Sequence, residues 1–371
     1  MGTMVQDLKS VVLKYNTYVL PTLMYGLEAL TLSRNNIEKL ETYHRQNIRC
    51  MLYLPRSVAT PAIHLLSGVL PVEAELHIKC LALFRNIIAA SDTNIPAKFL
   101  KDFITRQLAM KDNKSSSWTV YIKLLLQKYN LPALPDIIDN PPSKAVWVRI
   151  IKKSVHQWWT DYFQEAASSM SSLAYVNVKK CNTRTLHASL RNLMCTLTVK
   201  KATVKIQLLL KRYPLTTCKT SGPKMRELCP LCHQEPETTE HFILICTKLQ
   251  KPRIPFLIKI MQLIRIQRVD IQLENIIKAI LDVNHLPFPD PQFEKISRDM
   301  IFKLHHRRAL LLGGEWCSAY KLHVLPLPKK KKSARIGDPL DTERGTQRGM
   351  KEKMKAPVTG PKKSAKISPE L

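Results

Sequence analysis

Residues 145–163 read AVWVRIIKKSVHQWWTDYF, and this stretch decides the fold class. Its large apolar side chains recur every three or four positions, which is the period of an α-helix with one buried face. They are Trp147, Ile150, Ile151, Val155, Trp158, Trp159 and Phe163. Arg149, Lys152 and Lys153 fall between them and predict a basic, hydrated face. We expect the apolar stripe to be core, and an exposed tryptophan that stacks on a base is the alternative.

The same period recurs on both sides of this stretch. It predicts helices over residues 10–30, 33–51, 61–90, 94–129, 145–175, 199–212, 254–266, 271–283 and 293–312. Pro21 should kink or restart the first of them, Ser33 can cap the second, and Gly68–Pro71 should interrupt the third. Four prolines within 131–143 predict a linker. Because no segment shows a persuasive strand pattern, the predicted fold is mainly α.

The charge of the chain narrows its partners. The 371 residues, 45% of them apolar, can bury a sizeable core, while 58 Lys and Arg against 29 Asp and Glu give a formal charge of +29. Such a chain repels itself unless a polyanion is near, so nucleic acid is the expected partner. Binding to an acidic membrane and simple solvation are the alternatives that charge alone leaves open.

No run of about 18 apolar residues and no signal-peptide order occur, so we expect an intracellular protein without a membrane partner. The nine cysteines fit a reducing compartment and metal binding better than a disulfide framework. Six of them stand outside any ligand spacing and are expected to be small, mostly buried apolar side chains. These six are Cys50, Cys80, Cys181, Cys195, Cys218 and Cys317.

A set of metal-ligand residues lies between positions 229 and 246. Cys229-Pro-Leu-Cys232 is followed after eight residues by His241 and after four more by Cys246. Three thiols and one imidazole make a full tetrahedral set for Zn²⁺, so we predict one structural zinc per chain. The alternative is that His241 and Cys246 are ordinary residues of the apolar segment 242–245. His233 would need a strained chelate beside Cys232 and is expected to face solvent.

A catalytic zinc of the deaminase type does not fit this motif. Such enzymes need a proline directly before the first cysteine and a separate His-x-Glu upstream. Here Leu228 precedes Cys229, and His233-Gln-Glu235 follows the cysteine pair. Four protein ligands also leave no open position for water.

Basic residues precede the metal motif and are the candidate nucleic-acid contacts. We expect those of the helix at 199–212 to point outward, and all of them to act on phosphates without base preference; a solvated face is the alternative. They are Lys200, Lys201, Lys205, Lys211, Arg212, Lys219, Lys224 and Arg226.

From residue 325 the chain is rich in Lys and Arg and poor in large apolar residues, which predicts a disordered basic tail. It contains a cluster of the nuclear-import type, formed by Lys329, Lys330, Lys331, Lys332 and Arg335. A tail that touches phosphates without being an import signal is the alternative.

Two segments resemble a known family. YNTYVLPTLMYGLE at 15–28 and IEKLETYHR at 37–45 resemble the end of the reverse transcriptase domain and the helical thumb of LINE-type, non-LTR retrotransposons. The Cys-Cys-His-Cys cluster is similar to the one near the C-terminus of those polyproteins, and the two features occur in the family's order. The resemblance covers about a third of the chain, mainly residues 10–90 and 220–250.

The resemblance implies a chain without polymerase activity. The family copies RNA into DNA with palm carboxylates that hold two metal ions, and its palm signature ends in adjacent aspartates, whereas this sequence has no Asp-Asp pair. The fingers and the endonuclease would precede Met1. We therefore expect a truncated or degenerate element, or a gene model that begins late.

The expected organisation follows the chain from end to end. It comprises a thumb-like helical unit at 1–92, a helical connector with a Pro-rich linker at 93–143, a basic helical region at 144–226, a zinc module at 227–250, C-terminal helices at 251–324 and the tail at 325–371. The expected function is non-catalytic binding of RNA or DNA in the nucleus, alone or with an intact reverse transcriptase in trans. The alternatives are a zinc-stapled protein-interaction module and an element with no selected function.

Overall fold

The computed structural model describes residues 7–90, 93, 95–109, 117–216, 228–268 and 270–313. Within these ranges α-helices form the fold, and the only β contact is an isolated antiparallel bridge between Leu228 and Pro236. The prediction of a mainly α fold is confirmed. The described residues belong to one compact unit, residues 1–325, while the predicted tail lies outside the described residues.

The first part of this unit contains nine α-helices among the described residues. They are α1 (Leu8–Lys14), α2 (Leu20–Leu23), α3 (Arg34–Met51), α4 (Thr60–Ser67), α5 (Val72–Ile88), α6 (Ile95–Ala109), α7 (Trp118–Lys128), α8 (Leu134–Asp139) and α9 (Lys144–Ser168). A π-helical turn, Tyr15–Val19, joins α1 to α2 just before Pro21. The wider turn accommodates the proline, which lacks an N–H and crowds the preceding turn. Ser33 caps α3 as expected, by accepting from the amide of Asn36.

The predicted break after residue 67 is confirmed. Helix α4 ends at Ser67, and Gly68 adopts φ +68°, the left-handed conformation that favours glycine. A Cβ at Gly68 would lie 2.5 Å from the carbonyl carbon of Thr185. The glycine is therefore required both by its own backbone and by the close approach of a distant segment.

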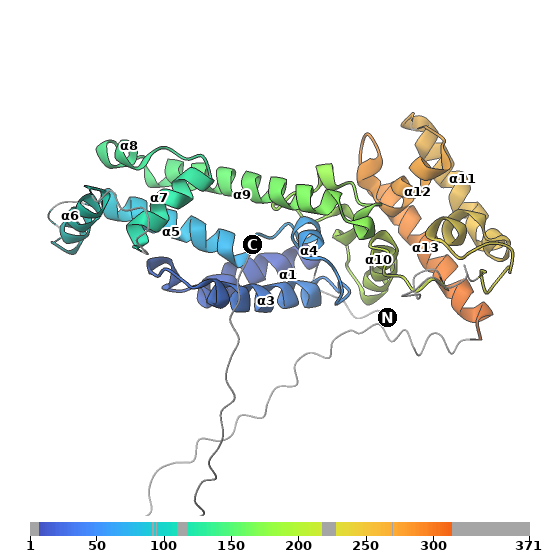
Figure 1. Cartoon of the computed structure of the whole chain (residues 1–371). Helices are drawn as coiled ribbons and strands as arrows, with labels where there is room; N and C mark the ends of the chain where they lie inside the picture. Colours follow the sequence, from blue (N-terminus) through green and yellow to red (C-terminus); the bar gives the residue numbers. More distant parts are fainter. Residues whose placement is uncertain are drawn as a thin grey trace, which may run out of the picture. The chain divides into compact units, whose positions relative to one another are not determined.

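Helix α9 carries the central apolar stripe and lies beside α5 (Figure 1). The indole N–H of Trp147 donates to the carbonyl of Leu81 at 2.9 Å, and the ring of Phe163 stacks on His64 with 4.8 Å between centroids. Trp147 and Phe163 are buried, which confirms the core interpretation. Trp158 is half-buried, and the Lys128 ammonium lies 4.2 Å from its ring centroid.

The prediction of a linker at 131–143 is wrong in part, because residues 134–139 form α8. Pro135 stands in the first turn of this helix, where its missing N–H would have had no intrahelical partner. Leu134 and Ile137 are buried in the main core, so the short helix is held by packing.

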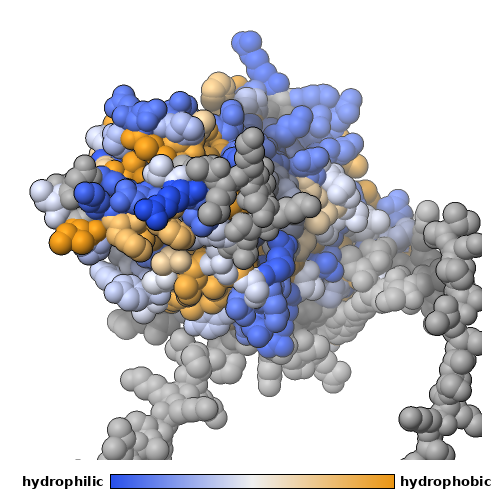
Figure 2. Space-filling view, turned by 60° about the vertical axis from the view of Figure 1, so that its left-hand side comes forward, coloured by the Kyte–Doolittle hydropathy of each residue, from blue (hydrophilic) through white to orange (hydrophobic). Residues whose placement is uncertain are grey.

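Helix α6 presents an apolar face to solvent. Ile95, Phe99 and Phe103 recur at four-residue spacing and are 80%, 71% and 47% exposed. Figure 2, in which the end that carries α6 comes forward, shows apolar side chains among charged ones on this face.

The second part of the unit contains α10 (Thr196–Leu209), α11 (Gln250–Ile266), α12 (Leu273–Leu281) and α13 (Pro291–Leu311). Helix α13 packs against both α10 and α11 (Figure 1). These four helices agree with the predicted ones to within a few residues, although α10 ends before Lys211.

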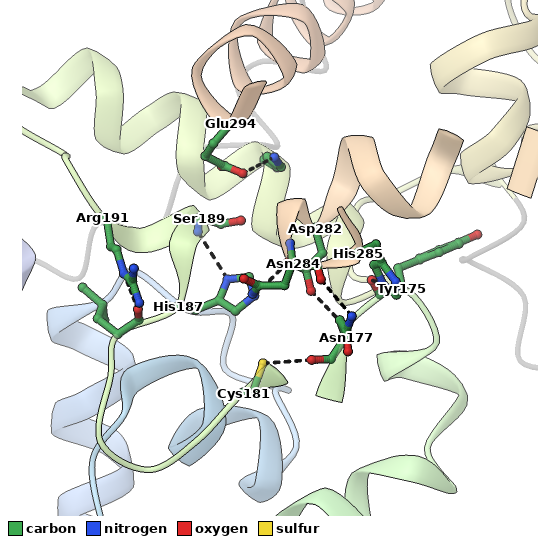
Figure 3. Close-up of polar contacts among 12 residues, drawn as sticks. Tyr175, Asn177, Cys181, His187, Ser189, Arg191, Asp282, Asn284, His285 and Glu294 are labelled. Carbon is green, nitrogen blue, oxygen red and sulfur yellow. Dashed lines mark hydrogen bonds and ion pairs between the residues drawn. The ribbon is translucent and has the colours of Figure 1, made fainter. Parts of the chain in front are cut away.

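The segment 169–195 joins the two parts through the 3-10 turns η3 (Ser171–Leu173), η4 (Val178–Lys180) and η5 (Ala188–Leu190). The amide of His187 donates to the carbonyl of Leu66 at 2.9 Å. On the other side, Asp282 accepts from the amide of Asn177 at 2.7 Å and pairs with the His187 ring at 3.2 Å (Figure 3). Buried polar contacts therefore connect this segment to α4 and to the residue that follows α12.

Candidate metal centre

Four predicted ligand residues converge in space. The ligand atoms of Cys229, Cys232, His241 and Cys246 all lie within 4.8 Å of one another. The sulfurs of Cys229 and Cys246 are 3.9 Å apart, and the sulfur of Cys232 is 3.3 Å from Nε2 of His241. The cluster can therefore hold a metal ion, which favours the predicted ligand set over the alternative that His241 and Cys246 are ordinary residues of an apolar segment.

A tight turn brings the first two cysteines together. The amide of Cys229 donates to the carbonyl of Glu235 at 2.7 Å, and the amide of His233 donates to the carbonyl of Cys229 at 2.9 Å. His233 has φ +57°, which reverses the chain directly after Cys232. Its side chain is exposed, as expected, and it takes no part in the cluster.

A π-helical turn, η7 (His241–Ile245), places the other two ligands. The amide of Cys246 donates to the carbonyl of His241, five residues earlier, at 2.8 Å. Within this turn Phe242 and Ile243 are buried in the core. The burial of these apolar residues between the ligands thus holds His241 and Cys246 in position.

Glu235 supports the histidine ligand and was missed in the sequence. Its carboxylate lies 3.3 Å from Nδ1 of His241, which leaves Nε2 facing the cysteine sulfurs. A carboxylate on the far nitrogen fixes the tautomer and the orientation of a metal-binding imidazole. The signal available in the sequence was an acidic residue three positions after Cys232.

Arg253 lies behind the cluster and was also missed. Its guanidinium donates to the carbonyls of Leu244 at 2.7 Å and Cys246 at 3.0 Å, and the residue is buried. Burial lowers the pKa of Arg253, while the nearby Cys246 acts in the opposite direction. Three thiolates around a divalent ion leave one negative charge, which this buried cation can offset.

Burial raises the pKa of the Cys246 thiol to about 12, and the neighbouring Cys229 adds to this rise. Without a cation in the cluster this thiol therefore holds its proton at neutral pH. Metal binding must release that proton, because the thiolate is the ligand.

A buried ion pair attaches the cluster to α13. Arg308 donates to both carboxylate oxygens of Glu237, at 2.7 Å and 2.8 Å, and both residues are buried. A bidentate pair of this kind fixes orientation as well as distance. The segment that carries the ligands is therefore held against the C-terminal helices.

The basic residues predicted to contact nucleic acid differ in their exposure and in their partners. Lys200 and Arg212 are exposed, Lys201 pairs with Asp299 at 2.7 Å, and the ammonium of the partly buried Lys211 lies 5.0 Å from the ring centroid of Tyr175. Lys219, Lys224, Arg226 and the tail residues Lys329, Lys330, Lys331, Lys332 and Arg335 lie outside the described residues.

The outward placement of Lys205 is wrong. This lysine is fully buried, and its ammonium donates to the carboxylate of Glu294 and to the hydroxyl of Ser297, each at 2.7 Å. Burial lowers its pKa, and Glu294 acts against that shift. Because the charge is enclosed and paired, Lys205 cannot reach a phosphate in this fold.

Two exposed lysines next to the cluster were overlooked. Lys248 and Lys251 follow the ligand Cys246 and point to solvent.

Among the isolated cysteines, Cys80 and Cys181 are buried as expected, whereas Cys50 is exposed and Cys195 is half-buried. Cys218 and Cys317 fall in parts of the chain that the structure does not describe.

A second polar cluster surrounds His187, Asp282 and Cys181 (Figure 3). These are residue types of a thiol hydrolase, but each of the three is at most 5% exposed. The burial of Asp282 would raise its pKa, yet the His187 ring and the amides of Asn177 and Asn284 outweigh it, so the pKa lies below its usual range. The cluster is closed to substrates and serves to hold the chain segments together.

No protein-family model, no curated protein and no solved structure matches this chain. The helices of the described ranges include none that is long and apolar enough to cross a membrane.

Proposed function

We propose that this chain is a non-catalytic nucleic-acid-binding fragment of a LINE-type reverse transcriptase, and that its Cys-Cys-His-Cys cluster holds one structural Zn²⁺. The observation that carries the zinc assignment is the convergence of four ligand atoms within 4.8 Å. The nuclear location and a partnership with an intact reverse transcriptase belong to the same proposal and rest on the tail sequence and the family resemblance.

The ligand spacing supports zinc. Two sulfurs at about 2.3 Å from a tetrahedral ion are about 3.8 Å apart, and the Cys229 and Cys246 sulfurs are separated by 3.9 Å. Soft sulfur with one imidazole is a preferred donor set of this ion. Because four protein ligands complete the tetrahedron, the bound ion would stabilise the fold and would not activate water.

Zinc content tests this assignment. Mass spectrometry of the purified protein should find about one zinc per chain, and Cys229→Ser combined with Cys232→Ser should abolish it. Cys50→Ser combined with Cys195→Ser is the matched control, because it also removes two thiols but none in the cluster. Zinc-free wild-type protein, or equal loss in the control, would refute the zinc site.

The nucleic-acid assignment is supported by unpaired basic surface beside the cluster. Arg212, Lys248 and Lys251 are exposed, and none of them forms an ion pair with a described carboxylate. With a formal charge of +29, the chain should bind a polyanion through phosphates. The logarithm of the binding constant should then fall linearly with the logarithm of salt concentration, by about 0.7 per phosphate contacted on a single strand.

Fluorescence anisotropy with labelled single-stranded RNA and DNA measures this dependence. We expect binding at low salt and a steep loss between about 50 and 200 mM salt. Absence of binding to either strand at low salt would refute the proposed function, whatever the zinc content.

A specific observation favours one other candidate, a zinc-stapled module for protein interaction. The exposed apolar face of α6 (Ile95, Phe99 and Phe103) is the kind of surface that docks to a partner (Figure 2). Association with a protein that persists at high salt, without RNA or DNA binding, would favour this candidate.

A further inference from the structure

A groove of about 710 Å³ lies between the segment after η5, α10 and the first half of α13. This volume is in the range of small-molecule sites. Its polar lining includes Arg191, Asn192, Thr198, Lys201, Lys295 and Arg298. Of these residues, the sequence predicted only Lys201 as a ligand contact.

The groove carries more positive than negative charge. Glu294 is shared by two cations, Lys205 at 2.7 Å and Arg298 at 3.2 Å, so this trio keeps one positive charge. The Lys201–Asp299 pair is neutral. Arg191 and Lys295 are exposed and have no described carboxylate within ion-pair distance.

Asp290 is the remaining acid of the lining, and it is engaged as the cap of α13, where it accepts from the amide of Gln292 at 2.8 Å. The lining cations therefore outnumber the lining carboxylates by one, and by two when the buried Lys205 that pairs with Glu294 is included. Such a surplus favours an anionic ligand. Figure 3 shows Arg191 on the segment after η5, where its Nε donates to the carbonyl of Leu186 at 2.6 Å, and Glu294 on α13; both residues line this groove.

Arg298 gives an independent indication of a ligand. The residue is only 7% exposed, and its Nε is buried without a hydrogen-bond partner among the described residues. A buried donor without an acceptor is unfavourable, and native structures usually satisfy it. Arg298 also lines the groove, so a turn of its guanidinium, whose Nε is enclosed in this fold, would let an anionic oxygen bound there accept this hydrogen bond.

We infer that this groove, here named the α10–α13 groove, binds a backbone phosphate of a nucleic-acid strand. Arg191 and Lys295 supply charge at its surface, and Arg298 supplies a donor at its base. Asn192 and Thr198 add an amide and a hydroxyl that can bond to phosphate oxygens. The inference rests on the proposed function and locates one of its contact sites.

The test compares two double variants that each remove one Arg and one Lys. Arg191→Ala with Lys295→Ala alters the groove, and Lys303→Ala with Arg307→Ala alters exposed positions of α13 outside the lining. Anisotropy of a labelled single-stranded RNA is measured over a range of salt concentrations. The groove variant should lower the salt slope by about 0.7, the value for one lost phosphate contact, and the control should lower it less.

A second readout uses inorganic phosphate as competitor at constant ionic strength. Phosphate should displace RNA from the wild type and from the control more readily than from the groove variant. Helical circular dichroism of both variants should match the wild type, because all four positions are exposed. Thermal unfolding should shift little, since Arg191→Ala loses a hydrogen bond to the carbonyl of Leu186 that is worth about 1 kcal/mol.

The outcomes separate the two proposals. Equal slopes and equal competition in the groove variant and the control would overturn the groove assignment while RNA binding stands. Phosphate binding that is lost in the groove variant without any change in RNA affinity would show a site for free phosphate and would also overturn it. A wild type that binds neither RNA nor DNA would refute the proposed function, and the strand-binding role of the groove with it.

Discussion

Lys205 distinguishes a structural lysine from a phosphate contact. It is fully buried, and its ammonium pairs with Glu294 at 2.7 Å. Lys205→Met keeps the apolar stem of the side chain and removes its ammonium, and Glu294 then keeps Arg298 as its one cation. The ammonium donates two hydrogen bonds, to Glu294 and Ser297, and at about 1.5–2.5 kcal/mol each their loss should cost about 3–5 kcal/mol. Lys200→Met, at an exposed position of the same helix, should change stability by less than about 0.5 kcal/mol.

Thermal unfolding followed by circular dichroism measures the difference. At about 2 °C per kcal/mol for a chain of this size, Lys205→Met should lower Tm by about 6–10 °C. RNA binding below that temperature should keep its salt slope, because Lys205 reaches no phosphate. A Tm shift equal to that of Lys200→Met, or a slope reduced by about 0.7, would refute the buried pairing and restore the outward placement.

Three further predictions concern stability. Gly68→Ala should lower the free energy of unfolding by more than about 2 kcal/mol, since it combines a left-handed φ with a clash. Gly26→Ala meets no atom within 4 Å and should lower it by about 1 kcal/mol. Urea unfolding measures both, and equal losses would contradict the close approach at Gly68. Asp282→Asn should cost about 3 kcal/mol at pH 7 by removing the buried partner of His187, and wild-type stability in the variant would show that the pair is absent. Burial lowers the pKa of His64 to about 3, against about 6.5 in an unfolded chain, so its contribution is full above pH 6.5 and is lost as pH falls toward 3. The urea concentration at the unfolding midpoint should therefore fall as the pH is lowered from 6.5 toward 3. In His64→Gln it should fall less steeply with pH; the same pH dependence in the variant and the wild type would contradict this.

Most helices could be predicted from the sequence because their signals are local. The apolar period through Trp147 and Phe163, the Ser33 cap and the break at Gly68 each depend on residues within a few turns. The linker prediction at 131–143 was wrong because proline can also begin a helix. Residues 134–139 form a helix because Leu134 and Ile137 are buried against side chains of other helices, which the local sequence does not show.

The four metal-ligand residues were also within reach of the sequence. Their spacing is short, and thiol and imidazole are specialised donors, so the ligand set could be proposed without the fold. The residues that support the site could not be predicted from the sequence. Glu235 and Arg253 are ordinary charged residues in the sequence, and only the turn and the helix beside Cys246 show that they serve the cluster.

The sequence by itself determined the helical class and the ligand set, because periodicity and short ligand spacing are properties of neighbouring residues. Tertiary structure alone decided which lysines are free. Lys205 meets Glu294 across 89 positions, and Glu237 meets Arg308 across 71. A helical pattern gives the face on which a lysine lies, but not whether a second helix with a carboxylate covers that face. The α10–α13 groove has the same origin, since its cations come from segments that are neighbours only after the chain has folded.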